Sequence, residues 1–331
     1  MRRVSAPFLA TVTATAAAIV LLAPPLRAQS TPGAAAFAQR LAQLTAVSGY
    51  EQATIDTLLA LLPGAARDRA GNAVLRIGSG EPKRLVACGV DEPGVVVGGV
   101  RDDGYLTLRR VGRGGPLADQ QLEGQRVTLF GRRGEVPGVV GVRSVHLTRG
   151  RPGGSDLPFA LDDAFVDVGA ASRAGVAALG VRVLAPVALA KRPHRYGADL
   201  LAAPVAGARA ACAALLAAAR SGGRERGSAS GPGTTVIALT VEDRFTGRGL
   251  ATLATTLGPF EQTLLLGAAT GPAGTLVESA DSSAAGRRPA LGRVTRWDLP
   301  VRYAGWPAET VSLGDADRLA TRLAEWIRGA Q

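Results

Sequence analysis

Two acidic pairs in this sequence directly follow apolar runs. Asp91-Glu92 comes after residues 85–88, and Glu242-Asp243 comes after residues 235–241. Both runs predict buried strands, and loops at strand ends of α/β sheets collect functional residues. Carboxylate oxygens are also ligands for hard cations, so Glu92 and Glu242, together with Asp199, can in principle supply a cation site.

The usual ligands of transition metals are scarce in the 331 residues, which include two histidines and two cysteines. His194 lies in a basic segment and His146 in a polar one, so we expect both to be solvated. Cys88 and Cys212 cannot form a disulfide framework. Their apolar surroundings favour buried free thiols, and a bond between them is the alternative in an exported protein.

The net charge of +11 does not indicate a nucleic-acid-binding protein. Of the 38 basic residues only Lys83 and Lys191 are lysines, and the arginines are scattered in ones and twos. A nucleic-acid surface needs clustered basic residues, and stacking needs aromatic residues, which make up 4% of this chain. We therefore expect no nucleic-acid partner.

The first 28 residues have the layout of a secretory signal peptide. Arg2-Arg3 precedes an apolar stretch at 8–23, and small Ala28 follows a proline pair. Three threonines interrupt the apolar stretch, which is shorter than the ~20 residues of a spanning helix, so cleavage is favoured over an anchor. We expect an exported protein, periplasmic or extracellular, without a membrane span after cleavage.

Beyond residue 28 the patterns predict an α/β domain with an insertion. Apolar spacing over 37–62 predicts two helices, and residues 67–72 predict a tight turn between strands. Residues 95–160 differ, because apolar residues alternate with arginines between frequent turn signals, which predicts a small all-β domain. The α/β domain would then comprise residues 29–94 and 161–331. Further predicted elements are strands at 85–88, 235–241 and 263–266 and helices at 207–220, 249–257 and 315–328.

Several motifs occur together in the order and spacing of one known family. They are Ser48-Gly49-Tyr50-Glu51, Val90-Asp91-Glu92, Asp102-Asp103-Gly104, Val166-Asp167-Val168-Gly169, Thr240-Val241-Glu242-Asp243 and Arg302-Tyr303. The sequence thereby resembles the glutamyl or deblocking aminopeptidases, the TET-type, cellulase-M-like zinc peptidases. This resemblance implies a mixed-sheet, phosphorylase/hydrolase-like α/β domain with an inserted β domain that supports oligomerisation. It also implies a centre of two zinc or cobalt ions that activates water for peptide hydrolysis.

The resemblance assigns five metal-ligand positions, and none of them holds a ligand residue here. They fall on Gly89, Ala203, Arg244, Gly267 and Gly305. The general base falls on Asp243, one methylene shorter than glutamate, and Asp91 keeps an orienting position without its histidine. A guanidinium at Arg244 opposes divalent cations directly. We therefore expect no metal cofactor and treat Asp91 and Asp243 as remnants of a catalytic site.

These features favour a non-catalytic pseudo-peptidase that binds a peptide, or that assembles with itself or with an active relative. In this hypothesis Arg244, Glu92 and Glu242 line the cleft, and Arg244 pairs with Asp91 and Asp243 or with a ligand carboxylate. The alternatives are an active metallo-aminopeptidase with relocated ligands and a structural component of a cell-envelope assembly.

One local feature follows from the resemblance alone. In this broad group of peptidases a cis peptide bond follows the metal-bridging aspartate. Here that position is Ala203-Pro204, and a proline makes the cis form far less costly. We therefore predict a cis bond between Ala203 and Pro204.

Overall fold

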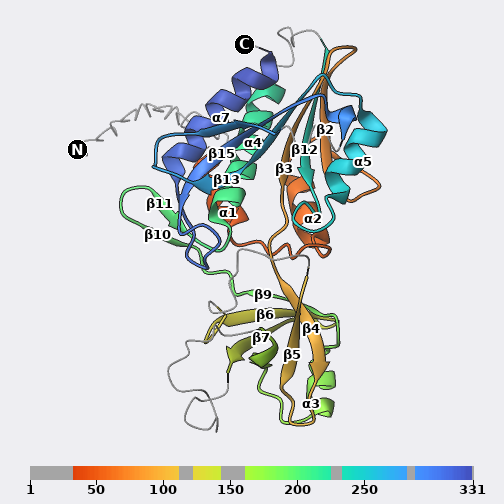
Figure 1. Cartoon of the computed structure of the whole chain (residues 1–331), viewed down its shortest axis with the longest axis vertical. Coiled ribbons are helices and arrows are strands. Elements are labelled where there is room, and N and C mark those ends of the chain that lie inside the picture. Colours follow the sequence, from red (N-terminus) through yellow and green to blue (C-terminus); the bar gives the residue numbers. More distant parts are fainter. Residues whose placement is uncertain (1–32, 112–121, 143–160, 225–232, 282–287, 330–331) are drawn as a thin grey trace, which may run out of the picture. The chain divides into compact units, whose positions relative to one another are not determined.

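The structure, a computed structural model, describes residues 33–111, 122–142, 161–224, 233–281 and 288–329. Its larger sheet has ten strands in the order β1-β2-β12-β3-β13-β15-β16-β11-β10, with β14 paired to β15 (Figure 1). Pairing is parallel from β12 through β3 and β13 to β15 and antiparallel elsewhere, so the sheet is mixed, as predicted. The strands are β1 (Ala66–Arg67), β2 (Ala73–Ser79), β3 (Lys83–Gly89), β10 (His194–Tyr196), β11 (Leu200–Ala202), β12 (Gly233–Thr240), β13 (Gln262–Thr270), β14 (Val277–Ala280), β15 (Arg293–Arg302) and β16 (Thr310–Ser312).

Side-chain alternation along the central strands divides the core into two faces. In β3, Val86 and Cys88 belong to the cluster built with the helices on one face, whereas Leu85 and Ala87 pack with α5 on the other. Helices α1, α4 and α7 lie together in Figure 1, away from α5. The helices of this domain are α1 (Ala34–Leu41), α2 (Gln52–Leu61), α4 (Ala206–Arg224), α5 (Arg248–Leu257) and α7 (Leu313–Arg328), with the 3-10 helix η4 (Pro289–Leu291).

Helix α4 packs closely against the sheet because alanines cover most of its length. Those alanines are almost completely buried and contact both α1 and α7 as well as β13. Small side chains bring the helix backbone near the strands. Strand β3 is buried on both faces. The loop that carries Asp91 follows its carboxyl end.

The insertion is a closed barrel with the strand order β4-β5-β8-β7-β6-β9. Its core is rich in valine and leucine, as expected for alternating strands that close on themselves. The strands are β4 (Val95–Val100), β5 (Leu106–Arg110), β6 (Arg126–Gly131), β7 (Gly134–Gly141), β8 (Phe165–Asp167) and β9 (Pro186–Leu189). The short helices α3 (Arg173–Ala178) and η3 (Leu161–Asp163) lie between these strands in the chain.

The barrel corrects the predicted end of the insertion at residue 160. Strands β8 and β9 close the barrel and extend it to Leu189. These strands have three and four residues, too few for a readable alternation, and α3 between them resembles the helical pattern of the other domain. The chain therefore returns to the α/β domain about thirty residues later than the composition indicated.

The main predicted elements of the α/β domain are present. Helices α1 and α2 cover the predicted pair, β1 and β2 flank the predicted turn, and α4, α5 and α7 match the predicted helices. No helix in the described ranges is long and apolar enough to cross a bilayer.

Candidate functional site

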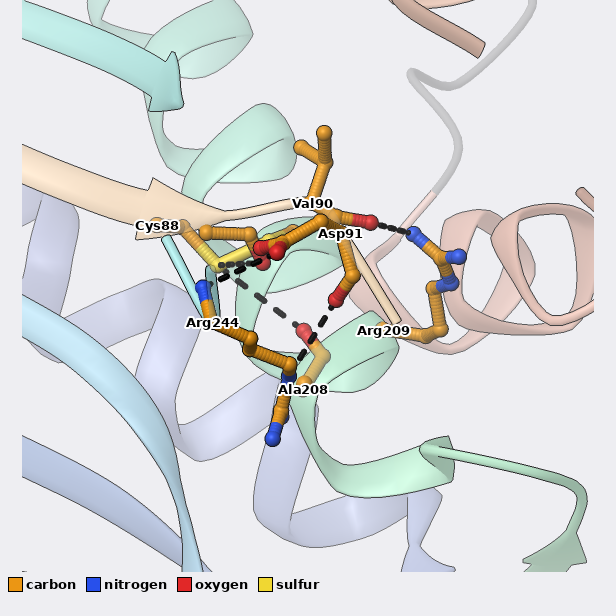
Figure 2. Close-up of a disulfide and its surroundings, with 8 residues drawn as sticks. Cys88, Val90, Asp91, Ala208, Arg209 and Arg244 are labelled. Atoms are coloured by element: carbon orange, nitrogen blue, oxygen red, sulfur yellow. Dashed lines mark hydrogen bonds between the residues drawn. A yellow bond between two sulfur atoms is a disulfide. The ribbon is translucent and has the colours of Figure 1, made fainter. Parts of the chain in front are cut away.

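Asp91 is buried at the end of β3 and joins three segments of the chain. Its Oδ2 accepts hydrogen bonds from Ser48 Oγ at 2.6 Å and from the backbone N–H of Arg244 at 2.9 Å. Its Oδ1 accepts one from the backbone N–H of Asp243 at 3.1 Å. Figure 2 shows the Asp91 carboxylate facing the backbone of Arg244. Hydrogen bonds to an ionised carboxylate are strong, so Asp91 positions the loop that follows β12.

Asp243 fills the space beside Gly89, where the resemblance places a metal-binding histidine. A Cβ atom on Gly89 would lie 2.7 Å from Asp243 Cβ and 2.9 Å from its Oδ2, so no larger residue fits without movement. Asp243 is an exposed residue as a whole, and neither oxygen of its carboxylate has a hydrogen-bond or ion-pair partner in the described chain. Desolvation by the surrounding protein, followed by the negative charge of Asp91, raises the pKa of Asp243. The positive charges that oppose this rise belong to Arg244, Arg296 and Arg288.

Arg244 is exposed beside this carboxylate. Its Nε donates a hydrogen bond to the carbonyl oxygen of Asp91 at 3.2 Å, and Figure 2 shows the outer end of the guanidinium directed away from Asp91. Within the described ranges its Nη1 and Nη2 have no partner, and no ion pair joins Arg244 to Asp91 or Asp243. Arg244 was predicted to pair either with Asp91 and Asp243 or with the carboxylate of a ligand. Its guanidinium does not pair with the carboxylates of Asp91 and Asp243. The outer nitrogens are left for a ligand.

An ion pair that the sequence analysis missed fills the space beside Gly267. Arg296 and Asp298 lie two residues apart on β15, with Arg296 Nη2 3.2 Å from Asp298 Oδ1, and Gly267 pairs with Asp298 in the strand register. A Cβ on Gly267 would lie 2.5 Å from that oxygen. The sequence did contain a signal for this ion pair. Residues i and i+2 of a strand project from the same face, so two opposite charges at that spacing in a mostly apolar strand indicate a pair.

Arg288, also missed, completes the group of arginines around Asp243. Its Nη2 donates to the carbonyl oxygen of Gly247 at 3.2 Å, in the loop that leads from Asp243 into α5. This residue comes from the segment before η4, far from β12 in sequence. Nothing in the local pattern around residue 288 predicted this contact.

Glu309 follows the Arg302-Tyr303 motif of the resemblance, which assigned it no role, and it organises the last two vacated positions. Its Oε2 accepts a hydrogen bond from Gly305 N at 2.8 Å and its Oε1 accepts one from Gly207 N at 2.9 Å. Ala203 N donates to the backbone oxygen of Glu309 at 3.0 Å. Both oxygens of this buried carboxylate are therefore occupied by backbone donors at the start of α4 and in the loop before β16.

The predicted cis bond at Ala203-Pro204 is wrong. In the described ranges cis bonds occur at Glu81-Pro82 and Gly258-Pro259, so the bond before Pro204 is trans. The chain turns into α4 through Val205 instead, whose φ of 51° lies in the left-handed region. Because the cis expectation came with the alignment at Ala203, that position has less support than the other four.

Glu92 is a buried carboxylate with partners of its own, and it also lines a small pocket with Pro204 and Gly305. It forms ion pairs with Lys191 and, at 3.7 Å, with Arg209, and its Oε1 accepts a hydrogen bond from Ala46 N at 2.8 Å. Burial alone would raise the pKa of Glu92, but the charges of Lys191 and Arg209 outweigh burial and lower it. Figure 2 shows Arg209 beside Val90, whose carbonyl accepts from its Nη1.

Glu242 is likewise held within its own loop rather than open to a ligand. Thr246 Oγ1 donates to it at 2.6 Å and Arg248 Nε at 2.9 Å, and its backbone N–H donates to Glu51 Oε1 at 2.8 Å. Burial would raise its pKa, but the hydrogen bonds from Arg248 and Thr246 lower it. Glu242 has a φ of 52°, in the left-handed region, at the turn that starts this loop.

The other candidate ligands lie apart from this group. Asp199 Oδ2 accepts hydrogen bonds from Ser312 Oγ at 2.6 Å and Gly314 N at 3.2 Å, at the start of α7. His194 is exposed on β10, and His146 lies outside the described residues. The alternative cation site built from Asp199, Glu92 and Glu242 is therefore wrong, since each carboxylate has its own partners.

Cys88 and Cys212 form a disulfide, which corrects the expectation of free thiols. Their Cα atoms lie 5.5 Å apart, and the bond connects β3 to α4 close to Asp91 (Figure 2). Alternation placed Cys88 on the face of β3 that packs against α4, and the small residues of that helix bring Cys212 within reach. The sequence analysis weighed residue type alone and did not use this alternation.

The residues at the five positions do not fit the two metal ions that the resemblance implies. A two-metal centre needs several convergent oxygen, nitrogen or sulfur donors. The described part of the chain contains no group of three His, Cys, Asp or Glu side chains arranged to hold a metal. The space beside Gly89 holds Asp243 itself, the space beside Gly267 holds the ion pair of Arg296 and Asp298, and Arg244 adds a second cation.

A mixed sheet with its candidate site at the carboxyl ends of parallel strands, interrupted by a small barrel, defines this chain as an aminopeptidase-type α/β protein. Residues 71–281, more than half of the chain, match the M42 glutamyl aminopeptidase family. The chain therefore belongs to that family.

Relatives and solved structures agree with this assignment. The chain is 34% identical over 183 residues to SgcX of Escherichia coli and 30% identical over 174 residues to the lysyl aminopeptidase of Pyrococcus furiosus. The matched segments cover 53% and 49% of this chain and 48% and 49% of those relatives, so the chain spans about half the length of the curated relatives it matches.

Two archaeal structures show the same fold over nearly the whole chain. The aminopeptidase of Desulfurococcus kamchatkensis has a TM-score of 0.76 at 19% identity, covering 89% of this chain and 94% of that one. The TET1 peptidase of Pyrococcus horikoshii has a TM-score of 0.76 at 20% identity, covering 87% and 97%.

Proposed function

We propose that this chain is an exported, non-catalytic member of its family, a pseudo-peptidase that has exchanged its metal centre for a charged ligand-binding site. The observation that carries the proposal is the filling of two ligand positions. Asp243 occupies the space beside Gly89, and the pair of Arg296 and Asp298 occupies the space beside Gly267. Restoring a metal ligand at either glycine would need the surrounding side chains to move.

Arg244 supports a binding role for the site. Its outer nitrogens are open to solvent in the described structure, and guanidinium groups bind carboxylates through paired hydrogen bonds. If the guanidinium of Arg244 were fully paired with Asp91 and Asp243 in a closed site, it would have no donor left for a ligand. Binding of a ligand that is not hydrolysed fits the geometry best.

Export is supported by two independent features. The N-terminal pattern is that of a signal peptide, and the bond between Cys88 and Cys212 is typical of proteins in oxidising compartments. We expect the exported protein to begin at Gln29, which mass spectrometry of its N-terminal peptide checks. An N-terminal peptide that retains residues 1–28 contradicts the proposal.

Assembly with copies of itself is part of the proposal. The Pyrococcus horikoshii peptidase, which shares this fold, is described as assembling into a tetrahedron or a large octahedral shell. The barrel of this chain corresponds to the inserted domain that the resemblance links to oligomerisation. Light scattering of the purified protein measures the assembly size, and a monomer at micromolar concentration contradicts this part.

Hydrolysis of a panel of aminoacyl amides, with and without added zinc or cobalt, tests the loss of catalysis. We expect no turnover above the uncatalysed background, with the lysyl aminopeptidase of Pyrococcus furiosus as the positive control. Metal-dependent turnover that is lost in Asp243→Asn contradicts the proposal, because it requires a working base and a bound metal.

A further inference from the structure

Charged groups of both signs are left without partners at the carboxyl edge of the sheet. In the described ranges the Asp243 carboxylate accepts no hydrogen bond, and Arg244 Nη1 and Nη2 donate none. Arg296 uses Nε and Nη2 on Asp298, which leaves Nη1. Within these ranges the Asp243 carboxylate thus lacks a donor, and the free nitrogens of Arg244 and Arg296 lack an acceptor. Groups of opposite sign that are close but not paired complement a ligand that carries both charges.

The strand register shows how near the free groups of opposite sign are. Asp243 lies beside Gly89 at the end of β3, and Arg296 lies beside Gly267 on β13. These strands are neighbours, with Leu266 opposite Cys88, and neighbouring strands are about 4.8 Å apart. Arg244 follows Asp243 directly in the chain. The free groups of opposite sign therefore come from neighbouring strands and from adjacent residues, so one small ligand can contact both.

The charges of the region favour a ligand that carries both signs over a ligand of one sign. Asp91 is satisfied by Ser48 and two backbone N–H groups, and Asp298 by Arg296. A purely anionic ligand would leave Asp243 unpaired beside Asp91, and a purely cationic ligand would face the arginines. Each leaves one of the free charges of the site without a partner.

From this arrangement we propose that the site binds a free α-amino acid, with its ammonium group on Asp243 and its carboxylate on Arg244 and Arg296. Both charged groups of an α-amino acid are attached to one carbon atom, which suits protein groups that come from neighbouring strands. A longer peptide separates its terminal amine from its terminal carboxylate by the length of the chain. This inference rests on the proposed function, because in a working peptidase the position of Asp243 belongs to the general base rather than to a ligand contact.

Isothermal titration calorimetry on the full protein tests the inference. Each proteinogenic amino acid is titrated at millimolar concentration, and the one that binds best is compared with its N-acetyl and amide derivatives. We expect binding of at least one free amino acid and about tenfold or greater weakening when either charge is blocked, because each makes charge-assisted hydrogen bonds.

Variants connect the binding to the named residues. Asp243→Asn and Arg244→Gln each weaken binding about tenfold or more, whereas Arg173→Gln, which removes an exposed ion pair with Asp102 in the barrel, leaves it unchanged. Thermal melts confirm that the variants fold. Absence of binding by every free amino acid, equal binding of the amide, or unchanged affinity in Asp243→Asn overturns the inference.

The outcome is separable from that of the proposed function. Turnover assays on the same preparation report on catalysis independently of the titrations. No amino-acid binding together with no turnover removes this inference and leaves the pseudo-peptidase proposal standing. Turnover that requires metal removes both.

Discussion

Two charged clusters lie on either side of the step from Asp91 to Glu92, and they use their charges in opposite ways. Glu92 is enclosed by Lys191 and Arg209, with Ala46 N donating to it as well. Asp243, held beside Asp91 through its backbone, has a carboxylate that pairs with nothing in the described chain. Two adjacent residues, Asp91 and Glu92, therefore belong to different charged clusters. The cluster of Glu92 has all its charges paired, whereas the cluster of Asp91 includes the carboxylate of Asp243, which is unpaired in the described chain.

The difference indicates where stability and binding are located in this fold. A buried charge without its partner is strongly destabilising, so the Glu92 network holds the structure together only while it is complete. Unpaired groups with a shifted pKa at a solvent-accessible edge are instead typical of functional sites. The comparison leads to four predictions about stability.

Lys191→Met should produce the largest loss, about 4 kcal/mol of unfolding free energy, because it removes the shorter ion pair and leaves buried Glu92 with only the longer one to Arg209. Chemical denaturation measures the change. Lys83→Met is the matched control, since Lys83 pairs at 3.2 Å with the exposed Glu81 and should lose less than about 1 kcal/mol. Equal effects of the two substitutions would remove the distinction between a closed network and a surface pair.

Replacing both cysteines by alanine should cost about 3 kcal/mol, because the bond between Cys88 and Cys212 constrains an unfolded loop with a separation of 124 residues. Denaturation with and without reductant measures it. The reductant should destabilise the natural protein by a similar amount and leave the double variant unchanged. A reductant-insensitive natural protein would show that the two sulfurs are not bonded.

Gly89→Ala should destabilise by about 2 kcal/mol, because the new Cβ overlaps Asp243 Cβ, whose backbone is held in place by Asp91. Gly271→Ala is the control, since its nearest neighbours are at ordinary contact distance, 3.5 Å. Thermal denaturation compares the two variants. If Gly89→Ala were as stable as the control, the space beside Gly89 would be open and a histidine could occupy it.

Asp243→Asn should have the smallest effect and the opposite sign to the loss of Glu92. The pKa of Asp243 is raised in the fold, so its ionisation costs stability once the pH exceeds the ordinary value of 3.8. The pKa of Glu92 is lowered, so its contribution is present above 4.5 and is lost as the pH falls. Melting temperatures from acid to neutral pH should show Asp243→Asn stabilising at pH 7 and neutral in acid. A destabilised Asp243→Asn at pH 7 would mean that this carboxylate has a partner.

Local patterns in the sequence predicted the central strands, the helices around them and the loops that contain Asp91 and Asp243. Apolar periodicity is a local property, and β3 and α4 express it clearly. The end of the barrel was missed because β8 and β9 are too short to show alternation. The five metal-ligand positions came from the family resemblance and not from apolar periodicity.

The partners of the site residues were beyond the sequence because they depend on contacts between distant segments. Arg288, Arg296 and Glu309 come from three different segments, and only the sheet register brings Arg296 next to Gly267. Glu92 was assigned to the cleft from its neighbour Asp91. Its burial with Lys191 requires the return of the chain from the barrel, which no local pattern encodes.

The loss of the metal centre is tested most directly by zinc stoichiometry. The purified mature protein is dialysed against zinc at neutral pH, rinsed free of loosely held metal and measured by elemental analysis, with the Pyrococcus furiosus relative treated in parallel. The filled positions beside Gly89 and Gly267 predict no stoichiometric zinc. Two tightly bound ions per chain would contradict the account and restore a metallo-aminopeptidase.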